Sequence, residues 1–127
     1  MDKKRVLIID DEENFCKLAK KNIEQAGEFE VDIATNGDDG IRLVREIKPD
    51  LILLDIIMPG MDGGDVINLI RNDASIKDTP IVFLTSLVRE GESSSQESFT
   101  RGYSLLAKTV TVGELIACIK KNVRRSA

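Results

Sequence analysis

Histidine is absent from this sequence of 127 residues. Acyl transfer by a Ser-His-Asp triad and zinc binding through imidazole both need that side chain. A phosphohistidine carrier needs it as well. The chain is therefore expected to perform none of these three reactions on its own residues.

Long hydrophobic runs are also missing. No apolar stretch approaches the about 20 residues that cross a bilayer. The N-terminal "MDKKRVLIID" has too short an apolar run for a signal peptide. We therefore expect a cytoplasmic protein without a membrane span. In that compartment Cys16 and Cys118 are expected to pack as free thiols rather than to form a disulfide.

Positive charge is in the minority, because the net charge is −4 and the pI is about 4.9. Nucleic acids are bound by basic surfaces, so direct nucleic-acid binding is not expected. The terminal "KKNVRR" is basic, but positive charge at the end of a helix is favourable by itself. The length and the hydrophobic fraction of 42% suit one domain, residues 1–127, with a real core.

Short apolar runs alternate with longer amphipathic segments. The runs are "RVLII" (5–9), "VDIA" (31–34), "LILL" (51–54), "IVFL" (81–84) and "SLLA" (104–107). Such runs are typical of strands that helices cover on both faces. The sequence predicts a doubly wound α/β fold, with a five-stranded parallel sheet in the flavodoxin-like order 2-1-3-4-5 and helices on both faces.

Apolar faces and end signals predict helices between these runs. Four faces share helical spacing: Phe15, Leu18, Ala19 and Ile23 before Gly27; Ile41, Val44 and Ile47 before Pro49; Val66, Leu69 and Ile70; and Leu115, Ile116 and Ile119 after a Thr111–Glu114 capping box. Residues 89–102 hold glycines and serines, which disfavour helix interiors. We expect a short or frayed helix there, in the most mobile part of the fold.

Polar side chains follow four of the predicted strands. Asp10 and Asp11 follow the first, Asp55 the third, Thr85 the fourth and Lys108 the fifth. Parallel strands end at one edge of the sheet, and this order places the first strand beside the third. Neighbouring carboxylates need a cation, and Mg²⁺ is the ion that binds carboxylates and phosphate together. With a hydroxyl and an ammonium, these are the parts for phosphoryl transfer.

Each of these residues also has an ordinary explanation. Asp10 and Asp11 could cap the first helix, and Asp55 could begin a turn. A threonine after a strand is common, and a lysine in a loop is usually solvated. Their joint occurrence at strand ends, in this order, favours a functional site over separate ordinary roles.

Several segments resemble the receiver domain of two-component response regulators. They are "VLIIDDEENF", "NGDDGIRLV", "KPDLILLDIIMPGMDGGDV", "TPIVFLTS" and a lysine near the end, in family order over about residues 4–125. The resemblance implies that Asp55 is the phosphoacceptor. It also implies that Asp11 binds Mg²⁺ directly and Asp10 through water, with the backbone carbonyl of Ile57 completing the set. Thr85 would move toward the phosphoryl group, and Lys108 would pair with it.

The resemblance also implies partners. A sensor histidine kinase or a histidine phosphotransfer protein would donate the phosphoryl group, and the downstream protein target is not indicated. Phosphorylation would change the surface of the fourth strand, the fourth helix region, the fifth strand and the last helix. The chain would catalyse its own phosphorylation and slow autodephosphorylation without being a dedicated turnover enzyme.

Some positions depart from the family pattern. Thr109 follows Lys108 where the family has proline, so we expect a trans peptide there. Leu105 occupies the place of the switch aromatic, with Tyr103 two residues upstream, and Ser86 replaces a common alanine. Two apolar side chains, Ile57 and Leu87, would flank the path of the hydrolytic water, which predicts a long-lived acyl phosphate.

Two other functions remain open from the sequence. One is a constitutive interaction module that keeps the fold without phosphate, which Leu105 and the weak fourth helix favour slightly. The other is a Mg²⁺-dependent phosphatase, which lacks an evident acid or base near Asp55.

Overall fold

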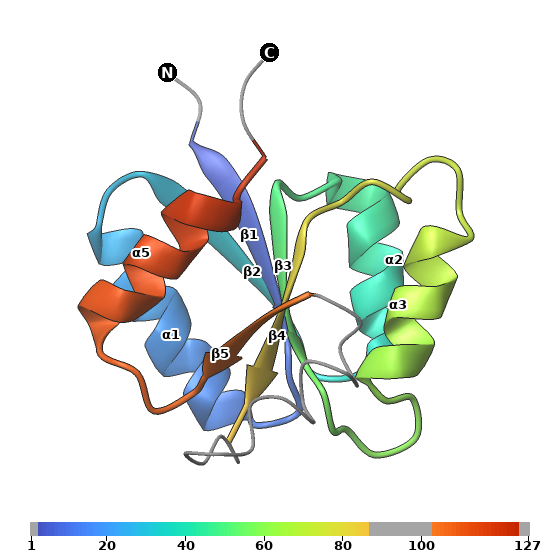
Figure 1. Ribbon diagram of the computed structural model, residues 1–127, viewed down its shortest axis with the longest axis horizontal. Helices are drawn as coiled ribbons and strands as arrows, with labels where there is room; N and C mark the ends of the chain where they lie inside the picture. Colours follow the sequence, from blue (N-terminus) through green and yellow to red (C-terminus); the bar gives the residue numbers. More distant parts are fainter. Residues whose placement is uncertain (1–2, 87–102, 125–127) are drawn as a thin grey trace.

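Five parallel strands form one sheet in the order β2-β1-β3-β4-β5 (Figure 1). The computed structural model describes residues 3–86 and 103–124. The strands are β1 (Lys4–Ile9), β2 (Phe29–Ala34), β3 (Leu51–Asp55), β4 (Ile81–Thr85) and β5 (Ser104–Ala107). The predicted fold class and strand order are confirmed.

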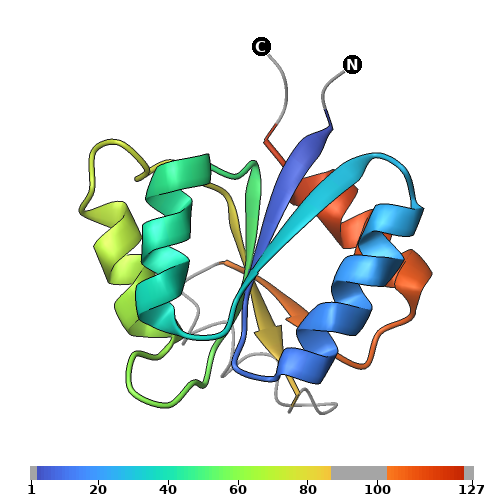
Figure 2. The same cartoon turned by 180° about the vertical axis from the view of Figure 1, so that it is seen from behind.

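Helices cover both faces of the sheet (Figures 1 and 2). On one face lie α1 (Glu13–Gln25) and α5 (Val112–Asn122), and on the other lie α2 (Gly37–Ile47) and α3 (Gly63–Arg71). The weak helix predicted in residues 89–102, with its mobility, falls outside the described residues. Among the described helices, none is long and apolar enough to cross a membrane.

Alternate residues of each central strand enter the two halves of the core. Val6 and Ile8 of β1 pack on the α1–α5 side, whereas Leu7 and Ile9 pack on the α2–α3 side. All four are fully buried. Full burial of one such side chain contributes about 1.5–3 kcal/mol. The sheet is therefore a rigid base for whatever its strand ends carry.

Two residues of the predicted apolar helix faces lie at the surface. Leu18 of α1 is 59% exposed and Leu69 of α3 is 42% exposed. In α1 the buried side chains are Cys16, Ala19 and Ile23, so the core-facing row passes beside Leu18. The equivalent row in α3 follows Val66 and Ile70. The buried faces of α1 and α3 are therefore narrower than the hydrophobic pattern suggests.

Side-chain caps fix the beginnings of α3 and α5. Asp62 accepts a hydrogen bond from Asp65 N at 3.0 Å and its own N–H donates to Asp65 at 3.2 Å, which makes a reciprocal capping box at α3. At α5, Thr111 Oγ1 accepts from Glu114 N at 3.1 Å, as predicted. The Glu114 carboxylate accepts from the Thr111 hydroxyl.

Gly63, the first residue of α3, lies directly against the end of β3. A Cβ atom there would be 2.7 Å from the carbonyl oxygen of Asp55 and 3.1 Å from the Cα atom of Ile56. At the next residue, Gly64, an added Cβ would meet only Asp62 Oδ1, at 3.3 Å. The first contact is with backbone, whereas the second is with a side chain that can move. Gly63 therefore lets α3 approach the strand end that carries Asp55.

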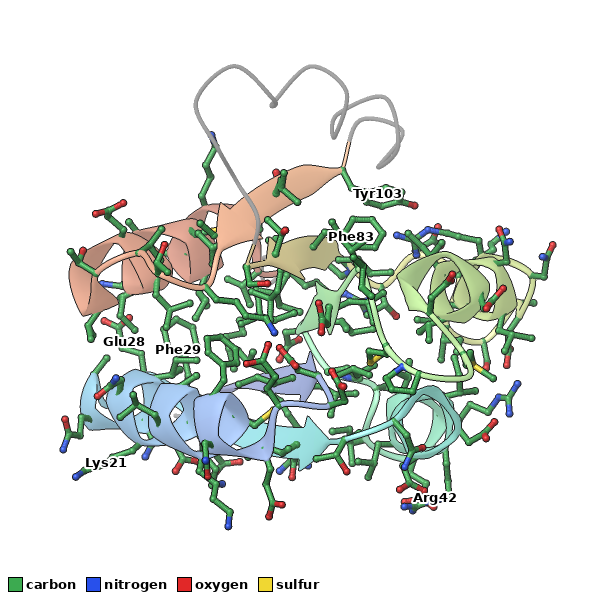
Figure 3. All side chains as sticks on the ribbon, turned by 90° about the horizontal axis from the view of Figure 1, so that it is seen from below. Lys21, Glu28, Phe29, Arg42, Phe83 and Tyr103 are labelled. Atoms are coloured by element: carbon green, nitrogen blue, oxygen red, sulfur yellow. The ribbon has the colours of Figure 1, made fainter. Side chains whose placement is uncertain are left out.

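Tyr103, just before β5, is fastened to the end of α3. Its ring meets the Phe83 ring edge-on, with 5.7 Å between centroids. Both side chains are labelled in Figure 3. Arg71 Nε donates to the tyrosine hydroxyl at 2.7 Å, and its guanidinium carbon lies 5.3 Å from the ring centroid. Arg71 also donates to the backbone carbonyls of Lys77 and Thr79. One arginine thus joins α3, the segment before β4, and the start of β5.

Gly63→Ala is expected to lower the free energy of unfolding by about 1–3 kcal/mol, because the added methyl group meets backbone that cannot yield. Gly64→Ala is the matched control and should stay within about 1 kcal/mol of wild type. Urea denaturation followed by circular dichroism measures both. Equal losses in the two variants would contradict the close approach at Gly63.

Tyr103→Phe should lower the free energy of unfolding by about 0.5–1.5 kcal/mol through loss of its hydrogen bond with Arg71. The same substitution in an Arg71→Met background should cost much less, because the partner is already gone. Denaturation of the four proteins gives the coupling energy. An equal cost in both backgrounds would show that the hydroxyl is not tied to Arg71.

Candidate functional site

The strand register brings the predicted site residues to one edge of the sheet. Ile9 pairs with Leu54, so Asp10 and Asp55 are the next residues on neighbouring strands. Thr85 pairs with Ala107, and Lys108 N donates to Thr85 O at 2.9 Å. Figure 3 looks onto this edge from below.

Three carboxylates meet there. An oxygen atom from each of Asp10, Asp11 and Asp55 lies within 4.8 Å of the others. Asp10 is fully buried, Asp55 is 6% exposed, and Asp11 is exposed. Asp10 Oδ1 accepts from Glu12 N at 2.9 Å, but Asp10 Oδ2 is buried without a well-aligned hydrogen bond. Three carboxylates with converging oxygen atoms suit a hard divalent cation.

Lys108 is the ammonium of the site. Its Nζ atom lies 2.6 Å from Asp10 Oδ2, 2.6 Å from Glu12 Oε1 and 3.4 Å from Asp55 Oδ2. The contact with Asp10 is an ion pair, although the approach is not aligned as a hydrogen bond. The Phe15 ring centroid is 5.1 Å from the same nitrogen, within cation–π range. The lysine side chain is only 7% exposed.

Burial and charge shift the acid–base behaviour of this site. Burial, reinforced by the neighbouring charge of Asp10, raises the pKa of Asp55 to about 7, while Lys108 opposes the rise. Burial alone would lower the pKa of Lys108, but its contacts with Asp10, Glu12 and Asp55 outweigh that effect and raise it. The lysine is therefore held as a cation, whereas the Asp55 carboxylate lacks enough positive charge around it.

The other predicted residues lie around this cluster. Thr85 is 7% exposed at the end of β4. Ile57 N donates to Asp55 Oδ1 at 3.4 Å, and the Ile57 side chain is one of the most exposed apolar groups described, at 69%. The peptide between Lys108 and Thr109 is trans, as predicted. Leu87, expected opposite Ile57, falls outside the described residues.

Sequence reasoning missed three residues at the site. Glu12 is the N-cap residue of α1, yet its side chain does not cap the helix and reaches Lys108 instead. Phe15 was predicted only as part of the apolar face of the first helix, and its ring also lies beneath the Lys108 ammonium. Cys16 Sγ donates to the Asp10 carbonyl oxygen at 3.3 Å, and burial raises the pKa of this thiol to about 12. Only Glu12 had a signal, as a third acidic residue after Asp10 and Asp11.

The arrangement can do two things chemically. Its excess of carboxylates over ammonium groups attracts a divalent cation, and its oxygens are the ligands that Mg²⁺ prefers. Its combination of the Asp55 carboxylate, the Lys108 ammonium and a buried threonine at one strand edge can accept an anionic, electrophilic group.

Comparison with known proteins gives the same picture. The response regulator receiver domain family matches residues 6–120. A curated relative from Synechocystis sp., the DNA-binding dual master transcriptional regulator RpaA, is 33% identical over 96% of this chain and 50% of its own length. The chain thus spans about half the length of that relative.

Solved structures share the fold. A putative response regulator from Chloroflexus aurantiacus has a TM-score of 0.82 at 26% identity, covering 94% of this chain and 97% of that one. The chemotaxis protein CheY4 of Vibrio cholerae has a TM-score of 0.81 at 23% identity, covering 94% and 98%. With its five-stranded sheet, its acidic pocket of Asp10, Asp11 and Asp55, and its lysine at the end of β5, the chain belongs to the response regulator receiver domain family.

Proposed function

We propose that residues 1–127 form a single phosphoacceptor receiver domain, which takes a phosphoryl group onto Asp55 from a phosphohistidine of a partner protein. One observation carries the proposal. The Asp55 carboxylate is held at a strand end beside two further carboxylates and 3.4 Å from the ammonium of Lys108. Carboxylates buried only for stability are not gathered in this way, because their mutual repulsion is costly.

The donor set fits Mg²⁺. We assign its binding to Asp10, Asp11, Asp55 and the backbone carbonyl of Ile57. The three converging carboxylates and the raised pKa of Asp55 both indicate a place where positive charge is needed. When bound, Mg²⁺ supplies positive charge beside the carboxylates and the incoming phosphoryl oxygens.

In the transfer, a carboxylate oxygen of Asp55 attacks the phosphorus atom of the donor. The phosphorus–nitrogen bond to the imidazole breaks, its electron pair stays on the ring nitrogen, and an acyl phosphate forms on Asp55. Lys108 pairs with a phosphoryl oxygen and the Thr85 hydroxyl donates to another. Since the chain has no histidine, the donor is a sensor histidine kinase or a histidine phosphotransfer protein.

The proposed output is a change in the surface made by β4, the predicted fourth helix region (89–102), β5 and α5, read by a protein partner in the cytoplasm. Thr85 and Lys108 lie on β4 and directly after β5, which links the site to this surface. The Synechocystis relative is named as DNA-binding. For these residues, with a net charge of −4, we propose no direct contact with nucleic acid.

Ile57 bears on the lifetime of the acyl phosphate. Its exposed apolar side chain offers no hydrogen bond to an attacking water near Asp55. We assign slow autodephosphorylation to the domain on this ground, so it catalyses its own phosphorylation without rapid turnover.

Incubation with acetyl phosphate and Mg²⁺ should add the mass of one phosphoryl group to the intact protein, because Asp55 is the nucleophile. Asp55→Ala should remove the addition, whereas Asp38→Ala, which deletes an exposed carboxylate at the start of α2, should keep it. Intact-mass spectrometry measures all three. A wild-type chain that stays unmodified would favour the constitutive interaction module.

In metal-free buffer, Asp55→Asn should be more stable than wild type at about pH 8, and the difference should shrink toward about pH 5. The folded pKa of Asp55, about 7, is above the ordinary value of 3.8. Protonated Asp55 therefore favours the folded state at low pH, and this contribution is lost as the pH rises between the two values.

Thermal melting with a chelator measures this difference. Asp38→Asn is the control and should show no such pH-dependent gain. Adding Mg²⁺ should raise the melting temperature of wild type more than that of Asp55→Asn. A difference between Asp55→Asn and wild type that grows on acidification would show that the carboxylate is not strained when charged.

A further inference from the structure

The Lys108 ammonium is not held mainly by Asp55. Its Nζ atom is 2.6 Å from Glu12 Oε1 and 2.6 Å from Asp10 Oδ2, but 3.4 Å from Asp55 Oδ2. Coulomb attraction falls with distance, so the nearer carboxylates dominate the position of the amine. In this structure the cation lies toward α1 rather than toward the residue proposed to accept phosphate.

Glu12 differs from the other carboxylates around Lys108. Its side chain is 58% exposed, whereas Asp10 and Asp55 are buried. It is not part of the three converging carboxylates. Its backbone N–H is fixed by Asp10 Oδ1 at 2.9 Å, while its side chain extends from the N-cap position to the lysine. Three carboxylates contact the Lys108 ammonium, and Glu12 is the one that does not belong to the cluster of Asp10, Asp11 and Asp55.

We propose that Glu12 is a positioning residue that holds Lys108 in the resting site and competes with the phosphoryl group on Asp55 for its ammonium. The inference rests on the function proposed above and deepens it. An exposed ion pair is weak, so a phosphoryl group with several anionic oxygens displaces Glu12 readily. The free energy needed to separate Lys108 from Glu12 therefore reduces the net affinity of the site for the phosphoryl group.

The surroundings restrict the other directions in which the amine can move. The Phe15 ring lies under the Lys108 ammonium, with its centroid 5.1 Å away. The Lys108 side chain is almost wholly buried. The backbone N–H of Lys108 donates to Thr85 O at 2.9 Å, which fixes the lysine backbone to β4. A short shift between Glu12 and the Asp55 side is consequently the motion that the contacts leave open.

The test is binding of beryllofluoride, a phosphoryl analogue, with Mg²⁺ at constant ionic strength. Glu12→Gln keeps the size and removes the charge, and should tighten binding about two- to fivefold, the range expected for losing an exposed ion pair. Glu13→Gln is the matched control, because Glu13 is the next acidic residue and pairs with Lys17 at 3.1 Å. It should leave the affinity unchanged within error.

A spectroscopic readout separates positioning from a general effect on α1. The side-chain Cε and Nζ NMR signals of Lys108 should shift in Glu12→Gln and stay in place in Glu13→Gln, even before the analogue is added. Unchanged Lys108 signals in Glu12→Gln would overturn the inference.

The outcomes also separate the two proposals. If wild type does not bind beryllofluoride with Mg²⁺, both the proposed function and the role of Glu12 fall. If wild type binds but Glu12→Gln behaves like Glu13→Gln, or binds more weakly than wild type, only the role of Glu12 is overturned.

Discussion

Among the described residues, Asp10 and Asp55 are buried beside a single ammonium, that of Lys108, and this is the constraint on which the structure depends. Taking carboxylates out of water is costly, and one lysine does not balance the charges gathered at the sheet edge. The strain shows in the raised pKa of Asp55 and in the buried Asp10 oxygen that lacks an aligned hydrogen bond. A fold selected for stability alone would place apolar groups here. The residual imbalance is therefore best understood as preparation for a cation and an anionic group.

The rest of the fold supplies the rigidity that this imbalance needs. The central strands are fully buried on both faces, so the strand ends cannot relax apart to separate the charges. Gly63 allows the backbone of α3 to lie against Asp55, and its N–H donates to Ile56 O at 3.0 Å. Backbone hydrogen bonds hold Lys108 beside β4 in the same way. Most of the sequence outside the site thus serves to keep a few side chains in an unfavourable arrangement.

Much of this arrangement was accessible from the sequence because it follows from the backbone. Apolar runs defined the strands, and strand order placed Asp10, Asp55, Thr85 and Lys108 at one edge. Side-chain contacts between distant segments were not accessible. The pair between Glu12 and Lys108 joins residues 96 apart, and no local pattern encodes it. The exposure of Leu18 and Leu69 was not predicted for a related reason, since hydrophobicity does not show where the neighbouring helix or strand lies.

The contacts of Leu105 and Tyr103 near β5 bear on how the site is connected to this strand. Leu105 pairs with Phe83 in the sheet and cannot form a hydrogen bond through its side chain. Tyr103 is the nearby aromatic, but Arg71 and Phe83 hold it against α3, on the α2–α3 face of the sheet. The β4–β5 ladder and the hydrogen bond from Lys108 N to Thr85 O join the site to β5. In the switch proposed above, a movement of the Thr85 or Lys108 backbone would act directly on that ladder.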